Sequence, residues 1–125
     1  MTKQGWLFLL ISSFLTVAAN LMIRGGIVRA GGFASRLSEF PQAILRLLSQ
    51  PIFVIGVVFY GTAALIWFKV IETEQLSIAY PLMVSLTFIF VTVGAILFYK
   101  EPFTWLKVLG CAVILLGILI FSQVK

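Results

Sequence analysis

Three ionisable side chains follow directly after a long apolar segment of the chain. Lys69, Glu72 and Glu74 place one ammonium group beside two carboxylates. A lysine ammonium binds phosphate as a compact point charge. The cluster therefore predicts an ionic site at the mouth of a cavity, where a phosphate or sugar headgroup binds. A lysine whose ammonium group simply reaches the lipid headgroups gives the same pattern.

A second set of polar side chains lies inside or at the ends of apolar segments. Asn20 is costly in lipid unless it is hydrogen-bonded, and Arg24 is able to hold a phosphate through two parallel hydrogen bonds. The other candidates can line an amphipathic cavity, and they are Tyr60, Trp67, Tyr80 and Ser85. Helix–helix hydrogen bonding by Asn20 and ordinary packing by the aromatic rings are the alternatives.

Composition decides the environment in which these groups act. Of the 125 residues, 62% are hydrophobic and only 10% are charged, with a mean hydropathy of +1.16. A water-soluble domain averages about 25% charged residues. The chain therefore requires lipid as its solvent. Its net charge of +5 is spread between the apolar segments, which favours contact with anionic headgroups over nucleic acid.

The same composition excludes several kinds of chemistry. The chain has no histidine and a single cysteine, Cys111, so it has no intramolecular disulfide and no histidine-based catalytic triad. It also lacks a cysteine cluster for a transition metal and a glycine-rich phosphate loop. We therefore expect neither an enzyme nor a protein with a cofactor or metal.

Four apolar segments are long enough to cross a membrane, which takes about 20 residues. Backbone polar groups must be satisfied within each segment in hydrocarbon, so each is predicted to be a helix. The sequence predicts an all-α integral membrane protein, with one domain over 1–125 and multi-pass insertion in a bacterial inner membrane. The expected helices are 5–23, 51–71, 75–99 and 103–124.

The long connection 24–50 carries its own pattern. Apolar residues recur every three or four positions, which predicts an amphipathic segment in the membrane interface. These residues are Phe33, Leu37, Phe40, Ile44 and Leu48. The pairs Gly25-Gly26 and Gly31-Gly32 predict flexibility before it. The segment serves either as a lateral gate for lipid or as a passive interfacial helix.

Charge distribution predicts an orientation. The first and third connections share one side of the membrane and hold six cations, namely Arg24, Arg29, Arg36, Arg46, Lys100 and Lys107. The opposite side holds three, namely Lys3, Lys69 and Lys125. Since cytoplasmic connections carry an excess of Lys and Arg, both termini are expected outside.

The acidic residues all lie in connections or at helix ends. They are Glu39, Glu72, Glu74 and Glu101. A proton-driven pump usually needs a carboxylate within the bilayer. Their positions therefore disfavour proton-coupled export.

Small residues on the fourth expected helix predict a contact between chains. Gly110 and Gly117 are seven residues apart and lie on one face with Val113 nearby. Small residues let helices approach closely in lipid, either between two chains or within one. Four helices hardly enclose a substrate path, which favours a dimer.

Several of these stretches resemble the drug/metabolite transporter superfamily. The matching stretches are 76–82 (Leu-Ser-Ile-Ala-Tyr-Pro-Leu), Val91-Thr92, Lys100-Glu101-Pro102 and the segment from Gly110 to Gly117. The chain looks most like its four-helix members, the small multidrug resistance proteins and especially the paired aminoarabinose-phosphoundecaprenol flippase subunits. The resemblance covers about 65–122 and, more weakly, 1–24.

The resemblance implies an antiparallel dimer, either a homodimer or a pair with a related four-helix chain, around a cavity that opens alternately to each side. Small multidrug exporters carry a glutamate in their first helix, near Leu15 of this chain, and its absence favours the lipid-flippase branch. We expect a flippase subunit for a polyprenyl-phosphate-linked sugar or related anionic lipid. The alternatives are a proton-coupled exporter of small cations or metabolites and a non-transporting partner of a glycosyltransferase.

Overall fold

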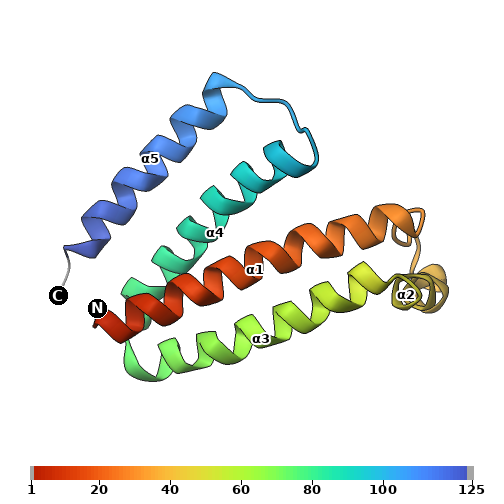
Figure 1. Ribbon diagram of the computed structural model, residues 1–125, viewed down its shortest axis with the longest axis horizontal. Coiled ribbons are helices and arrows are strands. Elements are labelled where there is room, and N and C mark those ends of the chain that lie inside the picture. Colours follow the sequence, from red (N-terminus) through yellow and green to blue (C-terminus); the bar gives the residue numbers. More distant parts are fainter. Residues whose placement is uncertain (1, 124–125) are drawn as a thin grey trace.

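Five α-helices and one short 3₁₀ turn make up the part of the chain that the computed structural model describes, residues 2–123 (Figure 1). The elements are α1 (Lys3–Arg29), η1 (Leu37–Glu39), α2 (Phe40–Leu48), α3 (Pro51–Thr73), α4 (Leu76–Phe98) and α5 (Trp105–Ser122). Lys125 and residue 124 of the last expected helix lie outside the described residues. Helices α1, α3, α4 and α5 are each long and apolar enough to cross a membrane, which confirms the predicted all-α membrane fold.

The four long helices alternate in direction. Helix α1 lies between α3 and α4 and packs against both, while α5 packs against α4 (Figure 1). The start of α1, the turn from α3 to α4 and the last turn of α5 lie at one end of the molecule, called the terminal end here (Figure 1). The connection from α1 to α3 and the connection from α4 to α5 lie at the opposite end, called the loop end.

Helix α1 is longer than the sequence analysis predicted, because Gly25 and Gly26 are helical. A Cβ at Gly26 would lie 2.5 Å from Phe53 Cβ and 2.9 Å from its Cα. The glycine therefore lets α1 and α3 approach closely, so the flexibility predicted for this pair is wrong. Gly31 and Gly32, with φ of 90° and 99°, adopt the left-handed backbone that ends the helix.

The core is small and lies toward the terminal end. Leu9, Val70, Leu82 and Ile118 come from four different helices and belong to one buried cluster. Most of the other large apolar side chains face outward, including Leu106, which is 79% exposed. This inverted distribution suits a protein whose surroundings are hydrocarbon rather than water.

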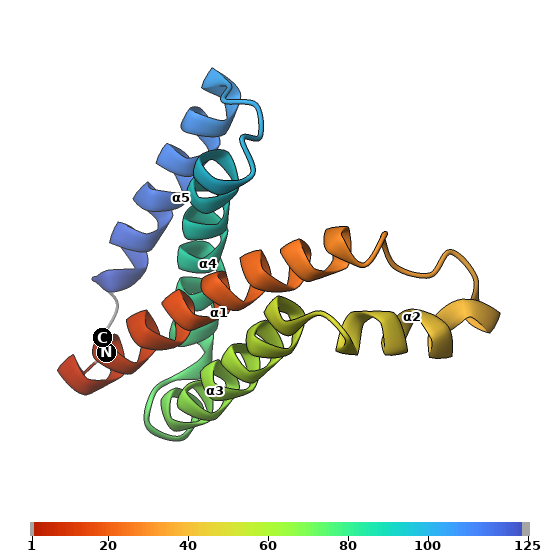
Figure 2. The same ribbon diagram turned by 45° about the vertical axis from the view of Figure 1, so that its right-hand side comes forward.

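Helix α2 projects sideways from the bundle at the loop end (Figure 2). Ala43 and Leu47 are buried, whereas Leu45 and Leu48 are exposed. The helix follows Glu39 and carries a proline in its first turn, where the missing N–H costs nothing. Its location in the membrane interface stays a prediction.

Candidate functional site

An ion pair at the loop end joins two parts of the chain that are far apart in sequence. The guanidinium of Arg24 on α1 donates to the carboxylate of Glu101, which lies in the connection from α4 to α5. The same guanidinium lies 4.8 Å from the ring centroid of Tyr99. The Tyr99 hydroxyl in turn donates to the backbone carbonyl of Leu21. Arg24 is therefore held in one orientation by a carboxylate and an aromatic face.

Lys107 brings a second cation to this end from the first turn of α5. The Thr104 hydroxyl caps that helix by accepting from the Lys107 backbone N–H at 3.2 Å. The Lys107 ammonium donates to the backbone carbonyl of Pro102 at 2.6 Å. Within residues 2–123, Lys107 forms no ion pair. The hydrogen-bond acceptor of its ammonium group is therefore a neutral carbonyl rather than an anion.

Glu101 lies in the field of both cations. The hydrogen bond from Arg24 lowers the pKa of Glu101 below its ordinary value of 4.5. Partial desolvation opposes this shift, and the charges of Arg24 and Lys107 add to it. Glu101 is therefore ionised at neutral pH.

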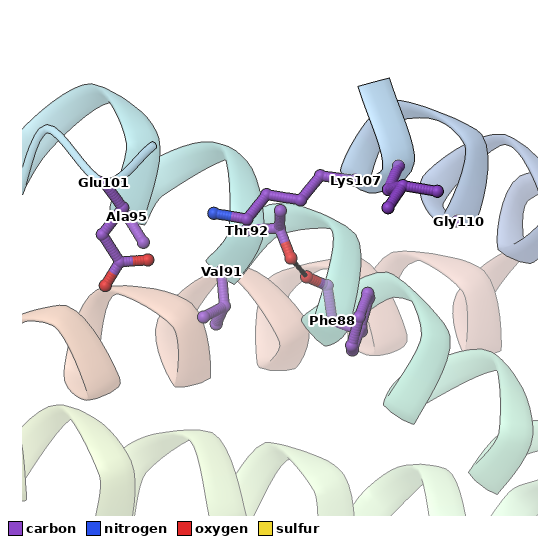
Figure 3. Close-up of a pocket in the computed structure, with 8 residues that line it drawn as sticks. Phe88, Val91, Thr92, Ala95, Glu101, Lys107 and Gly110 are labelled. Carbon is purple, nitrogen blue, oxygen red and sulfur yellow. Dashed lines mark hydrogen bonds between the residues drawn. The ribbon is translucent and has the colours of Figure 1, made fainter. Parts of the chain in front are cut away.

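A groove runs from this charged end along α4. A cavity of about 390 Å³ lies between α4 and α5, lined by Phe88, Val91, Thr92, Ala95, Glu101, Leu106, Lys107 and Gly110. A second cavity of about 470 Å³ shares three of these residues and extends along α4 toward α1, lined by Thr16, Met83, Val84, Thr87, Phe88, Val91 and Thr92. We call the two adjoining cavities the α4 groove. Figure 3 shows Lys107 extending from α5 past Thr92, with the Glu101 carboxylate directed toward α1.

Polar groups border this mainly apolar groove. Thr16, Asn20 and Arg24 are spaced by four residues, so they follow one face of α1. On α4, the Thr87 hydroxyl is buried and has no hydrogen-bond partner among the described residues. Thr16 and Thr87 therefore line the groove, and the polar face of α1 continues from Thr16 to the Arg24–Glu101 pair.

The charged cluster predicted at Lys69, Glu72 and Glu74 lies at the terminal end. Lys69 and Glu72 form an ion pair of 3.0 Å, with both side chains at least half exposed. Glu74 instead accepts from the backbone N–H and the hydroxyl of Thr2, so it fixes the start of α1. The three residues are neighbours, but Glu74 is engaged in joining α1 to the turn after α3.

The aromatic candidates gather in a separate place. Tyr60 and Trp67 on α3 line a cavity of about 150 Å³, together with Ser12 and Thr16 of α1. Tyr80 lies 6.3 Å from Trp67 between ring centroids. Helix α4 continues without a break through the proline that follows Tyr80. Trp67 and Tyr80 therefore lie toward the terminal end and Tyr60 near the middle of α3. Their cavity adjoins the α4 groove through the shared lining residues Thr16 and Met83.

Two further predicted polar residues lie on α1 and α4. Asn20 is exposed, and it is placed on the polar face of α1. Ser85 is half-buried and precedes Phe88 and Thr92 by three and seven residues, so it shares their face of α4. None of Arg24, Asn20, Ser85 and Lys69 is among the residues that line the two cavities, and their part in a binding site stays a prediction.

The glycines of α5 are unobstructed within this chain. A Cβ at Gly110 or Gly117 would meet no atom within 4 Å. Val113 between them is 60% exposed. Neither glycine serves close helix packing within the described chain, and a contact with a second chain stays a prediction.

The sequence analysis did not single out Lys107, Glu101 or Thr87 as site residues. A signal for the first two was present, because the topology placed Arg24, Glu101 and Lys107 on one side of the membrane. The signal for Thr87 was weak, since a threonine in an apolar helix usually bonds its own backbone, as Thr92 does to Phe88 at 2.8 Å.

Known proteins resemble this chain over nearly its whole length. It is 37% identical over 119 residues to a protein of Yersinia pestis (strain Pestoides F) named as a probable 4-amino-4-deoxy-L-arabinose-phosphoundecaprenol flippase subunit ArnE, covering 95% of this chain and 96% of that protein. A protein of the same name from Yersinia pseudotuberculosis serotype O:3 (strain YPIII) is 40% identical over 89 residues, covering 71% and 77%. No family model and no solved structure matches the chain.

The four spanning helices and these relatives define a multi-pass membrane transport protein of the bacterial inner membrane. The chain belongs to the family of the ArnE flippase subunits, within the small multidrug resistance-like superfamily. The resemblance drawn from its motifs is thereby confirmed. The chain is a flippase subunit and not an enzyme.

Proposed function

We propose that this subunit moves a polyprenyl-phosphate-linked sugar between the two leaflets by alternating access. The name carried by its relatives specifies an aminoarabinose-phosphoundecaprenol, which combines a sugar, a phosphate and a long apolar chain. A site for such a molecule needs an apolar track for the chain and polar groups for the headgroup.

The observation that carries the proposal is the α4 groove and its charged end. Apolar side chains line most of the groove, while Lys107 and Glu101 lie at its mouth. The polar face of α1 follows the same direction through Thr16 and Asn20. A lipid that lies in the groove therefore keeps its isoprenoid chain against apolar surface while its headgroup meets polar side chains.

The exposed side of α5 supports assembly with a second four-helix chain. The helix has one buried residue, Ile118, so most of its surface is free for lipid or protein. The proposed dimer uses Gly110, Val113 and Gly117 and completes the wall of the groove. The segment with α2 would then admit lipid from the side.

Reconstitution into vesicles tests the proposal. The subunit, alone and with a related four-helix partner, is placed in vesicles that contain a labelled polyprenyl-phosphate-linked sugar. We expect faster exposure of the sugar headgroup to an external reagent than in protein-free vesicles. A folded assembly that gives no acceleration contradicts the proposal, and proton flux driven by small cations would instead favour an exporter.

A further inference from the structure

The Glu101 carboxylate is an anion held between cations from two helices. Arg24 comes from α1 and is half exposed, while Glu101 is 31% exposed in its side chain. Lys107 comes from α5 and lines the same cavity as Glu101. The chain thus supplies its own negative group at the charged mouth of the α4 groove.

This arrangement has the features of an anion-binding site that is already occupied by a carboxylate of the same chain. A guanidinium offers two parallel hydrogen bonds to either a carboxylate or a phosphate, and an ammonium adds a point charge. Among residues 2–123, the ammonium of Lys107 donates only to the Pro102 carbonyl, a weaker partner than an anion. A phosphate has more acceptor oxygens than a carboxylate and is able to engage both cations.

We propose that the phosphate of a polyprenyl lipid binds between Arg24 and Lys107 by displacing Glu101. This inference rests on the proposed function, and it assigns the phosphate-binding residues and a competing internal group. The lipid chain extends from this point into the α4 groove. Further along that groove lie the half-buried Thr16 and the Thr87 hydroxyl, which has no partner in the described part of the chain, and both suit a headgroup that passes inward.

The occupant follows from charge and shape together. The mouth is basic once Glu101 is displaced, and the groove behind it is lined mainly by apolar side chains such as Phe88 and Val91. Free inorganic phosphate matches the mouth but not the groove, and an uncharged polyprenol matches the groove but not the mouth. A phosphate joined to a long apolar chain matches both.

Displacement also has a structural consequence. The Arg24–Glu101 pair ties the connection before α5 to α1. When phosphate takes the place of Glu101, this tie is released, so α5 is free to move relative to α1. Binding of the lipid headgroup is thereby coupled to opening of the groove.

Equilibrium binding by the full chain in lipid nanodiscs tests the site. The probes are a polyprenyl monophosphate, the matching polyprenol and inorganic phosphate, and tryptophan fluorescence reports occupancy. We expect Glu101→Gln to bind the polyprenyl monophosphate several-fold more tightly, because both cations remain and their competitor is gone. Lys107→Gln should bind it about tenfold more weakly, with polyprenol binding unchanged.

The matched control is Lys3→Gln, which removes the same charge at the terminal end and should change neither affinity. Unchanged or weaker binding by a folded Glu101→Gln variant overturns the site, as does an equal loss of polyprenol binding in Lys107→Gln. Inorganic phosphate that binds as tightly as the lipid also overturns it. Flipping in vesicles is measured separately. If the wild type flips the lipid but the affinities do not follow this order, only the proposed site is disproved. If the affinities follow this order but no flipping occurs, only the proposed function is disproved.

Discussion

The guanidinium of Arg24 and the carboxylate of Glu101 form an ion pair between residues 77 positions apart in the chain. The pair joins the last third of α1 to the connection that leads into α5. The aromatic ring of Tyr99 covers the same guanidinium. This contact fixes Glu101 at the loop end of the α4 groove, where Lys107 also lies.

Replacement of Arg24 by glutamine should impair transport more than folding. Both partners are partly exposed, and ion pairs of this kind contribute little to stability. The lost guanidinium should reduce flipping of a labelled polyprenyl-phosphate-linked sugar by about tenfold, the effect of losing one charge-assisted hydrogen bond. Initial flipping rates in vesicles measure the effect.

The control for this variant is Arg29→Gln, one to two turns further along α1. Arg29 forms no ion pair with the part of the chain that the structure describes. The Arg29→Gln variant should therefore flip lipid at the wild-type rate. Equal rates for Arg24→Gln and the wild type would show that the guanidinium has no role in transport.

The stabilising effect of Glu101 should depend on pH below its ordinary pKa. Arg24 on α1 and Lys107 on α5 both face the carboxyl group, beside the ring of Tyr99, and both cations stay charged in acid. Since the pKa of Glu101 is lowered in the fold, its contribution is complete above pH 4.5 and is lost as pH falls through the lowered value. Midpoints of thermal unfolding for the wild type and Glu101→Gln should therefore differ slightly above pH 4.5, and this difference should shrink as the pH falls through the lowered pKa. A difference that grows in acid would contradict this assignment.

The sequence was sufficient to predict the helices because lipid imposes strong constraints on them. Each spanning segment must satisfy its own backbone and expose apolar side chains, so length and hydropathy locate it. The ends of the helices were harder to predict from the sequence, as Gly26 shows. A glycine pair suggests flexibility in isolation, and only the position of Phe53 on α3 reveals that it permits close packing.

The site was predicted less completely, because it depends on contacts between distant segments. Arg24 was identified from its position at the end of an apolar segment. The selection of Glu101 and Lys107 requires knowing that the connection before α5 folds back onto α1. The role of Glu74 in holding the start of α1 through its bonds to Thr2 could not be predicted from the sequence either, and its part in an ionic site stays a prediction.

Gly26→Ala should destabilise the protein through direct collision with α3. The added Cβ would lie 2.9 Å from the Cα of Phe53, and a backbone atom cannot move without shifting the helix. A loss of about 1–3 kcal/mol is expected for such overpacking. Gly61→Ala is the matched control, since its Cβ would meet nothing within 4 Å. Thermal unfolding in detergent should separate the two variants, and equal midpoints would contradict close packing at Gly26.

The excess of cations at the loop end predicts that this end is cytoplasmic. In a Cys111→Ser background, a cysteine at Thr73 should react with an impermeant maleimide added to intact cells, and a cysteine at Ser35 should not. Thr73 lies in the last turn of α3 at the terminal end, and Ser35 lies before η1 at the loop end. Labelling of both from outside would indicate two orientations, as an antiparallel homodimer requires, and would contradict the single orientation.

Gly117→Leu should weaken the proposed dimer without unfolding the chain. Nothing lies within 4 Å of a Cβ at Gly117, so the larger side chain fits the single chain. In a dimer built on this face, the same side chain would separate the two helices, and we expect association about tenfold weaker. Energy transfer between the labelled subunit and a labelled second four-helix chain, either a related partner or a second copy, reports the association over a series of lipid dilutions. Gly61→Leu places the same side chain in open space on α3 and should leave energy transfer unchanged. If both variants behave alike, the face of α5 is not the contact, and the wall that completes the α4 groove must come from another surface.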